Sequence, residues 1–397
     1  MSQILDPSLG ASLPADGPRD GPGGGPGEVP GPATKAPTAK QFRLVWLAFR
    51  RHKLAVVSLV ILVGFLIVVA FAEFLAPFST SKLYEQYPYA PPQRLHVYDR
   101  TDQGGWDLGL YVYGYRDVQD PVSLRITYTV DESQKIPVHL FARGEKCKLL
   151  GLIPTDRHLI GPADPRQPMY LIGSDAIGRD LLSRLFYATR ISMTVGIVGV
   201  VLAFVLGVVL GGVSGYFGGW VDNVIQRFIE FVMAIPTLPL WVALTAAIPV
   251  SVGPVNRYFL ISVILAIIAW TTLAREVRGR FLMLREEDFV TSAWLDGSSR
   301  RRVMFRHMLP SFTSHLIAAL TLSIPGVILA ETALSWLGVG LQAPVVSWGV
   351  LLIDSQSVSA ISSAPWTLLP GVAVVVAVLA LNFVGDGLRD AADPYRT

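Results

Sequence analysis

The residues that most often carry covalent chemistry are sparse in this sequence and unfavourably placed. Ser214 stands between small residues in Gly212-Val-Ser-Gly215, but a nucleophilic serine needs a neighbouring histidine to accept its proton. None of the six histidines falls in the interior of an apolar run; they are His52, His96, His139, His158, His307 and His315. Neither His-Glu-x-x-His nor the phosphate-binding Gly-x-x-x-x-Gly-Lys-Ser/Thr pattern occurs. We therefore expect no catalytic residue and no enzymatic activity in this chain.

Metal, cofactor and nucleic-acid binding are not expected either. Cys147 is the only cysteine, so an intrachain disulfide is excluded, and no pair of histidines stands near it to complete a zinc site. The net charge is only +3, and the basic residues do not form the aromatic-studded stripe that nucleic-acid binding needs. These observations leave binding or transport as the remaining classes of function.

The composition indicates a membrane protein. Hydrophobic residues make up 51% of the chain and charged residues 16%, and the mean hydropathy is +0.47. A helix that crosses the hydrocarbon core needs about 20 apolar residues. Six segments qualify, at 54–76, 191–213, 225–248, 258–274, 313–337 and 367–386. We predict an all-α membrane protein with six transmembrane helices, in which Pro236, Pro239 and Pro325 kink helices rather than end them.

Two segments differ from the apolar runs. Residues 1–40 are dense in Pro and Gly and predict a disordered tail. Residues 78–188 contain runs that alternate or are rich in strand formers, at 111–115, 124–130 and 138–141, and predict a small β-rich insert between the first two helices. On one strand Tyr111, Tyr113 and Tyr115 would share a face, either as a ligand-stacking platform or as the core of the insert.

The basic residues predict the orientation. Lys and Arg concentrate on the cytoplasmic side of membrane proteins, and four such residues precede the first helix: Arg43, Arg50, Arg51 and Lys53. With six crossings, the arginine-rich loop 275–312 is also cytoplasmic, both termini are cytoplasmic, and the insert is extracytoplasmic. Arg179, Arg184 and Arg190 fall on the outer side, where we expect a helix that lies on the surface.

The loop 275–312 predicts two short helices rather than a simple connector. Glu286, Glu287 and Asp288 favour the start of the first helix, and Gly297 favours its end because it can adopt a left-handed conformation. The second helix would run from about Ser299 to Pro310 and is strongly basic, with Arg301 and Arg302 near its start. Fewer residues would close a helix bundle, so the loop is interpreted as a docking surface.

Small and charged residues within the apolar runs have structural interpretations. Gly207, Gly211 and Gly215 follow the small-xxx-small spacing that lets helix backbones approach closely, so we expect helix packing there. Glu230 stands one turn after Arg227, and Glu331 near the end of its run, so ion pairing or snorkelling is expected for both carboxylates.

The loop resembles the EAA loop of bacterial ABC importer permeases, the segment that docks on the ATPase. In that family the pattern is Glu-Ala-Ala, three residues, Gly, nine residues, Ile, one residue and Leu-Pro. The corresponding positions here are Thr291, Ser292, Ala293, Gly297, His307, Leu309 and Pro310. Thr291 and Ser292 depart from the triplet, and His307 replaces the isoleucine.

Further segments resemble the second permease of the peptide/nickel subfamily, the dipeptide and oligopeptide "C" permeases. They are Leu171-Ile-Gly-Ser-Asp-Ala-Ile-Gly-Arg-Asp-Leu-Leu-Ser-Arg184, Gly215-Tyr-Phe-Gly-Gly-Trp-Val-Asp222, Leu337-Gly-Val-Gly-Leu341, Ser347-Trp-Gly349 and Gly385-Asp-Gly-Leu-Arg-Asp390. The resemblance covers the first helix and residues 171–397. The insert 78–188 is longer than the loop that typical members have.

The resemblance implies a type I ABC importer permease of the cell membrane, with residues 189–397 as its five-helix core. Its partners would be a second homologous permease, two cytoplasmic ATP-binding subunits, an extracytoplasmic solute-binding protein and membrane lipid. Oligopeptides or dipeptides are the implied solutes, and oligosaccharides are the alternative, since importers of that class use the same permease type. Gly212-Val-Ser-Gly215 is also similar to the serine motif of rhomboid proteases, but no histidine is suitably placed. A simple channel would leave the basic loop without a purpose.

Overall fold

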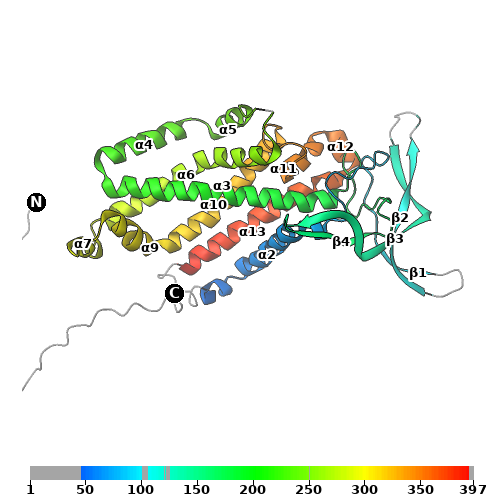
Figure 1. Ribbon diagram of the computed structural model, residues 1–397, viewed down its shortest axis with the longest axis horizontal. Coiled ribbons are helices and arrows are strands. Elements are labelled where there is room, and N and C mark those ends of the chain that lie inside the picture. The colour runs from blue at the N-terminus through cyan, green and yellow to red at the C-terminus, as the bar shows by residue number, and fades with distance from the viewer. Residues whose placement is uncertain (1–45, 101–105, 120, 122–125, 250, 393–397) are drawn as a thin grey trace, which may run out of the picture. The chain divides into compact units, whose positions relative to one another are not determined.

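Five long apolar helices dominate the computed structural model (Figure 1). The structure describes residues 46–100, 106–119, 121, 126–249 and 251–392, so the tail predicted at 1–40 lies outside the described residues. The long helices are α2 (Lys53–Leu75), α3 (Leu181–Phe217), α6 (Pro254–Leu284), α10 (Thr313–Trp336) and α13 (Leu369–Ala392). A bent pair of helices, α4 (Gly219–Ala234) and α5 (Thr237–Ala246), is long and apolar enough to make a sixth span if the two helices cross as one.

The bend between α4 and α5 corrects the prediction of a kinked helix over 225–248. The two helices meet at 87°. Ile235 is extended, as residues before proline prefer, and Pro236 forms the N-cap of α5. Pro239 lies in the first turn of α5, where its missing N–H removes no helical hydrogen bond. Pro325 lies inside α10, which continues through it as predicted.

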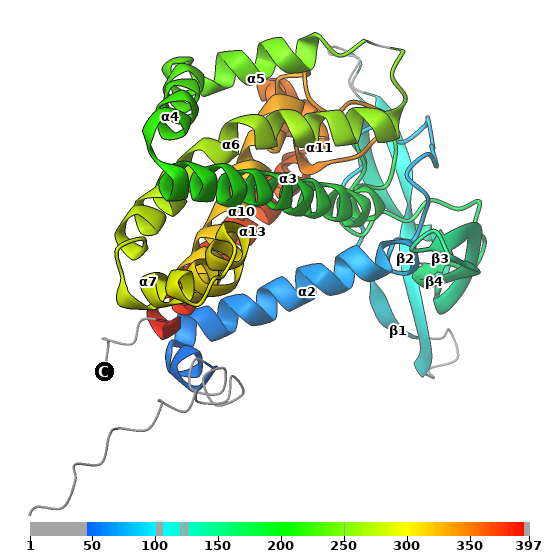
Figure 2. The ribbon, with the colours of Figure 1, turned by 60° about the vertical axis from the view of Figure 1, so that its left-hand side comes forward.

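The close approach of α3 and α6 depends on glycine. The two helices run side by side in both views (Figures 1 and 2). A Cβ at Gly207 would lie 3.0 Å from the Leu273 side chain, and one at Gly211 would lie 2.4 Å from the carbonyl oxygen of Ala274. A Cβ at Gly215 would lie 2.6 Å from the carbonyl oxygen of Arg278. The three glycines predicted to pack helices thus all face α6, and larger residues would push the two backbones apart.

The segment between α2 and α3 contains four antiparallel strands in the order β1-β2-β3-β4. They are β1 (His96–Arg100), β2 (Trp106–Gln119), β3 (Ile126–Leu149) and β4 (Ile153–Pro162). The predicted range 78–188 includes the first two turns of α3, which begins at Leu181. Between α10 and α13 the chain forms short helices, among them α11 (Trp348–Leu351) and α12 (Val358–Ser363).

Of the tyrosines of β2, Tyr115 belongs to a buried apolar cluster of the insert, together with Ala90 and Tyr170. The pairing of β2 with β3 shifts between Tyr113 and Gly114. Tyr111 and Tyr113 contact each other on one face of β2, with ring centroids 5.3 Å apart, and Tyr115 packs against Tyr170 on another segment. Tyr111 and Tyr115 are both buried. Burial raises the pKa of the Tyr115 hydroxyl well above its usual range, so this side chain stays neutral.

The arginines near the start of α3 are paired inside the structure, which corrects the expectation of a helix lying on the surface. Arg184 is buried and contacts the buried carboxylate of Asp175, and the Nε of Arg179 lies 2.7 Å from the same carboxylate. Arg190 binds Glu73 of α2, with 2.6 Å between Nη2 and Oε2. A buried guanidinium needs a carboxylate partner, so these positions follow local pairing rather than the positive-inside bias.

Two other buried carboxylates have hydroxyl partners. Glu331 of α10 is fully buried and accepts hydrogen bonds from Ser192 at 3.2 Å and Ser335 at 2.7 Å, so it neither pairs with a cation nor snorkels as predicted. Asp180 caps α3 by accepting from the backbone N–H and the hydroxyl of Ser183 at 2.8 and 2.6 Å. Burial raises the pKa of Asp180 to about 6. Glu230 does pair with Arg227, at 2.7 Å.

Candidate docking surface between α6 and α10

The connection between α6 and α10 is helical along most of its length. It contains α7 (Asp288–Leu295), α8 (Arg300–Arg302), a π-helical turn (Val303–Met308) and α9 (Leu309–Ser311). Glu287 occupies the N-cap position of α7 and Asp288 its first turn, where the helix dipole favours negative charge. The second helical stretch runs on from Arg300 to Ser311 without a gap, close to the predicted bounds.

The break between the two helical stretches is a Schellman motif centred on Gly297. The φ angle of Gly297 is +73°. Its N–H donates to the carbonyl of Trp294 at 3.0 Å, and the N–H of Ser298 donates to the carbonyl of Ala293 at 3.1 Å. No neighbouring atom lies within 4 Å of a Cβ built at Gly297. The backbone conformation, and not lack of space, therefore favours glycine here.

Apolar side chains attach the inner side of the loop to the ends of three long helices. Phe281 of α6 is buried at the centre of this cluster, and its ring meets that of Phe312 edge to face, with centroids 5.7 Å apart. The loop contributes buried Val290, Ala293, Val303, Met304 and Met308, with Leu309 partly buried, and α3 contributes Tyr216. Because the contacts are continuous, the loop and these helix ends form one packed unit.

The structure divides the predicted loop residues into two sets. Ala293 and Leu309 face the apolar cluster. The others are exposed and available to a partner: Thr291, Ser292, Gly297, Arg301, Arg302 and Pro310. The loop thus joins a fixed inner side to a polar and cationic outer side.

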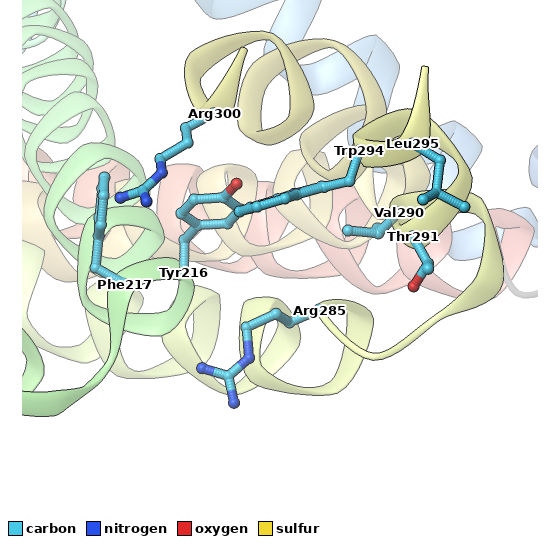
Figure 3. A pocket seen from close by; sticks show the side chains of 8 residues that line it. All are labelled: Tyr216, Phe217, Arg285, Val290, Thr291, Trp294, Leu295 and Arg300. Atoms are coloured by element: carbon cyan, nitrogen blue, oxygen red, sulfur yellow. The ribbon is translucent and has the colours of Figure 1, made fainter. Parts of the chain in front are cut away.

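A groove of about 540 Å³ lies between the loop and the end of α3 (Figure 3). Its lining residues are Tyr216, Phe217, Arg285, Val290, Thr291, Trp294, Leu295 and Arg300. The guanidinium of Arg300 lies 5.7 Å from the ring centroid of Phe217 and 6.0 Å from that of Trp294. Leu295 is 84% exposed beside it. Exposed aromatic and cationic side chains of this kind are typical of protein interfaces.

A polar network joins α4 to α6 beside the loop. The guanidinium of Arg278 donates to both carboxylate oxygens of Asp222, at 2.5 and 2.6 Å. Ser214 is buried, its hydroxyl donates to Asp222, and it accepts from the side-chain amide of Gln226 at 3.1 Å. The hydroxyl proton of Ser214 is thereby held by a carboxylate within a helix-packing network, and this is the arrangement of a structural serine.

Residues 187–396, more than half of the chain, match the family model of the binding-protein-dependent transport system inner membrane component. The chain belongs to this family. Residues 40–92 also match the model of the N-terminal transmembrane domain of oligopeptide transport permease C. The resemblance predicted from the motifs is confirmed, and the chain is a multi-pass membrane permease subunit of a binding-protein-dependent ABC importer. Such subunits act with ATP-binding and substrate-binding partners.

Named relatives agree with this membership. A dipeptide transport system permease protein of Alkalihalophilus pseudofirmus is 40% identical over 223 residues, covering 56% of this chain and 71% of the relative. The oligopeptide transport system permease protein of Haemophilus influenzae is 37% identical over 60% of this chain and 75% of its own length. A chain of the inward-facing methionine ABC transporter MetNI aligns with a TM-score of 0.40 and 16% identity over 54% of this permease and 96% of its own length.

Sequence reasoning missed the groove residues Phe217, Trp294 and Arg300. Tyr216 and Phe217 do belong to the motif Gly215–Asp222, in which Gly218 and Gly219 both have positive φ angles. That turn ends α3 directly after the aromatic pair and leaves it beside the loop. Two aromatic residues before a Gly-Gly turn at the end of an apolar run are the signal that could have indicated this surface.

Proposed function

We propose that this permease subunit carries oligopeptides or dipeptides across the cell membrane. The relatives at 35–40% identity with this chain include proteins named as dipeptide, oligopeptide and putative peptide permeases. Their similarity extends over 71–78% of their own lengths. The insert, which includes β1 to β4, lies outside the helical residues 187–396 that match the family model. The helical part can therefore carry the same class of solute.

The observation that carries the coupling role is the two-sided construction of the loop between α6 and α10. Its inner side is buried against Tyr216, Phe281 and Phe312, and its outer side presents Trp294 and Arg300 around an open groove. A partner that binds the outer side therefore acts on the ends of α3, α6 and α10. We assign this outer side to docking of a cytoplasmic ATP-binding subunit, with Gly297 at the turn that shapes it.

The full assembly proposed here has two permease subunits, two ATP-binding subunits and one solute-binding protein. ATP-driven closure of the ATP-binding pair would displace the two loops and rock the helices toward an outward-open state. The solute-binding protein would deliver peptide on the side that bears the insert. In this assembly the permease has no catalytic residue, and hydrolysis belongs to the ATP-binding subunits.

The proposed orientation has both termini and the loop on the cytoplasmic side. The loop and the adjoining turns of α6 carry arginines at 275, 278, 280, 285, 300, 301, 302 and 306, and such residues favour the cytoplasmic side. In sealed cells of a Cys147→Ser background, an impermeant maleimide should label Val130→Cys on the insert and leave Ser292→Cys on the loop unlabelled. Labelling of Ser292→Cys before the cells are permeabilised would reverse the proposed topology.

The substrate class is tested on the reconstituted importer with its cognate solute-binding protein. We expect di- and oligopeptides to bind that protein, stimulate ATP hydrolysis and accumulate inside vesicles, whereas maltotriose and other oligosaccharides should do none of these. Stimulation by an oligosaccharide without any response to peptides would contradict the proposed substrate while leaving the permease assignment intact.

A further inference from the structure

The hairpin formed by β3 and β4 ends in an apolar tip that is largely exposed. Leu150 is 57% exposed, Leu152 81% and Ile153 62%. The tip follows Lys146 and Lys148, both exposed, in the segment Lys146-Cys-Lys-Leu-Leu-Gly-Leu-Ile153. In water, three adjacent large apolar side chains at a turn are unfavourable, since turns are ordinarily polar.

The backbone of the turn is unfavourable for its sequence as well. Leu150 and Gly151 have φ angles of +51° and +74°, and the N–H of Leu152 donates to the carbonyl of Leu149 at 3.0 Å. Positive φ at both central positions is the pattern for which Asn-Gly or Asp-Gly is preferred. Leucine in the left-handed region is strained. Strain and exposure thus coincide at Leu150, which points to a role for this side chain in contact with something outside the fold.

The hairpin is fastened to the end of the α2 membrane span. His158 of β4 is buried and its Nδ1 lies 2.6 Å from the carbonyl oxygen of Ala76, the C-cap of α2. The ring of Phe141 on β3 meets that of Phe74 on α2, with centroids 6.0 Å apart. Figures 1 and 2 both show the hairpin beside this end of α2.

The contact with α2 also fixes the depth of the tip. The hairpin meets α2 at Phe74 and Ala76, the last turn of the helix and its C-cap. Glu73 stands 20 residues after Lys53, the first residue of α2, which is about 30 Å along a helix and equals the thickness of the hydrocarbon core. With Lys53 at one boundary of the hydrocarbon, the end of α2 and the hairpin attached to it therefore lie at the other boundary.

We propose that the hairpin tip inserts into the lipid leaflet at the end of α2 and anchors the insert to the membrane. Leu150, Leu152 and Ile153 would enter the boundary of the acyl chains beside α2. Only 17% of the apolar stretch of α2 is buried within the protein, so this helix also faces lipid. Lys146 and Lys148 stand on the strand that leads away from the tip, at the level where lysines reach the phosphates of headgroups. The lipid surface satisfies both the apolar tip and the flanking charges, which a purely apolar protein surface would not.

The test measures what surrounds the tip in the intact permease in vesicles. In a Cys147→Ser background, an environment-sensitive fluorophore is attached to Ile153→Cys. The matched control is the same fluorophore on Val130→Cys, because Val130 is also β-branched, also belongs to the insert and is also 62% exposed. The vesicles contain phosphatidylcholine and phosphatidylglycerol, with spin-labelled lipid as the membrane quencher and iodide as the aqueous quencher. Leu152→Cys repeats the measurement at a second tip position.

Lipid anchoring predicts opposite responses at the two sites. The probe at 153 should emit at shorter wavelength, be quenched by the spin-labelled lipid and be several-fold less sensitive to iodide than the probe at 130. Equal iodide quenching at 153 and 130 would overturn the proposal. Protection from both quenchers would also overturn it, because a protein surface would then cover the tip. Neither readout depends on transport, so failure here is separable from failure of the proposed substrate.

Discussion

Replacing Gly297 by valine tests whether the shape of the loop transmits ATP hydrolysis to the helices. The φ angle of +73° places Gly297 in the left-handed region, where a residue with a Cβ is destabilised by about 1–2 kcal/mol. The space around the site is open, so valine meets no steric obstacle other than its own backbone. The variant must either retain this strain or straighten the break between α7 and α8.

The size of the strain indicates which part of the loop gives way. Pulling the buried side chains of Val303, Met304 and Met308 out of the apolar cluster would cost roughly 4.5–9 kcal/mol, at about 1.5–3 kcal/mol each. This exceeds the strain at Gly297 severalfold. The loop should therefore stay attached to the helices while its outer face changes direction. We expect Gly297→Val to insert into the membrane with its helices packed normally.

The assay is ATP hydrolysis by the reconstituted importer, with and without loaded solute-binding protein. A change of 1–2 kcal/mol in productive docking corresponds to about 5–30-fold, so we expect stimulation by the binding protein to fall by that factor in Gly297→Val. Gly297→Asn should retain most of it, because asparagine tolerates the left-handed region.

The matched control is Gly338→Val. Gly338 ends α10 in a Schellman motif of the same kind, with φ +79° and open space around its Cβ position. The same local strain then acts away from the loop, and stimulation should be close to that of the parent protein. Normal stimulation in Gly297→Val, or an equal loss in both variants, would refute the coupling role of this turn.

Three further predictions concern other parts of the permease. Arg301→Ala combined with Arg302→Ala should lower stimulated ATP hydrolysis only a few-fold in the same assay, because exposed ion pairs contribute about 0–1 kcal/mol each. Gly211→Ala should lower the midpoint of thermal unfolding in detergent, since overpacking costs about 1–3 kcal/mol, whereas Gly279→Ala, with open space on α6, should not. The raised pKa of Asp180, about 6 against an ordinary 3.8, means that folding favours its protonated form. Its contribution to stability is present below pH 3.8 and lost as the pH rises through 6, by about 3 kcal/mol in total. Asp180→Asn should remove this part of the dependence of thermal unfolding on pH.

Apolar length allowed the long helices to be predicted, because only helices of about 20 apolar residues satisfy their backbone inside a membrane. The same signal could not reveal the break before Pro236. Hydropathy reports which residues prefer lipid, and it says nothing of the direction that the chain takes after a proline. The start of α3 at Leu181 was missed for a related reason. Arg184 and Arg190 interrupt the apolar pattern, and only their partners Asp175 and Glu73 show how the helix accommodates them.

The parts of the loop that depend on residues close together in the sequence could be predicted, and those that depend on contacts between distant residues could not. At the end of α7 the N–H of Gly297 donates to a carbonyl three positions earlier and the N–H of Ser298 to one five positions earlier, so sequence spacing contained that information. The groove joins Phe217 to Trp294 and Arg300, more than 70 positions away, and no local pattern places them together. The carboxylate of Glu331 was misread for the same reason, since one of its hydroxyl donors, Ser192, is 139 positions away.

The attachments of the loop to α6 and α10 differ, and this difference bears on how displacement would be transmitted. On the α6 side only Arg285 to Glu287 separate the helix from α7, and Phe281 in the last turn of α6 packs directly against the loop. On the α10 side the π-helical turn Val303–Met308 and Phe312, with φ −125° and ψ 24°, interrupt regular α-helix. Irregular turns of this kind absorb changes in backbone angle at lower cost than a continuous helix. A force on the loop should therefore move the end of α6, and through Gly211 and Gly215 the end of α3, as one body, while α10 pivots about Phe312.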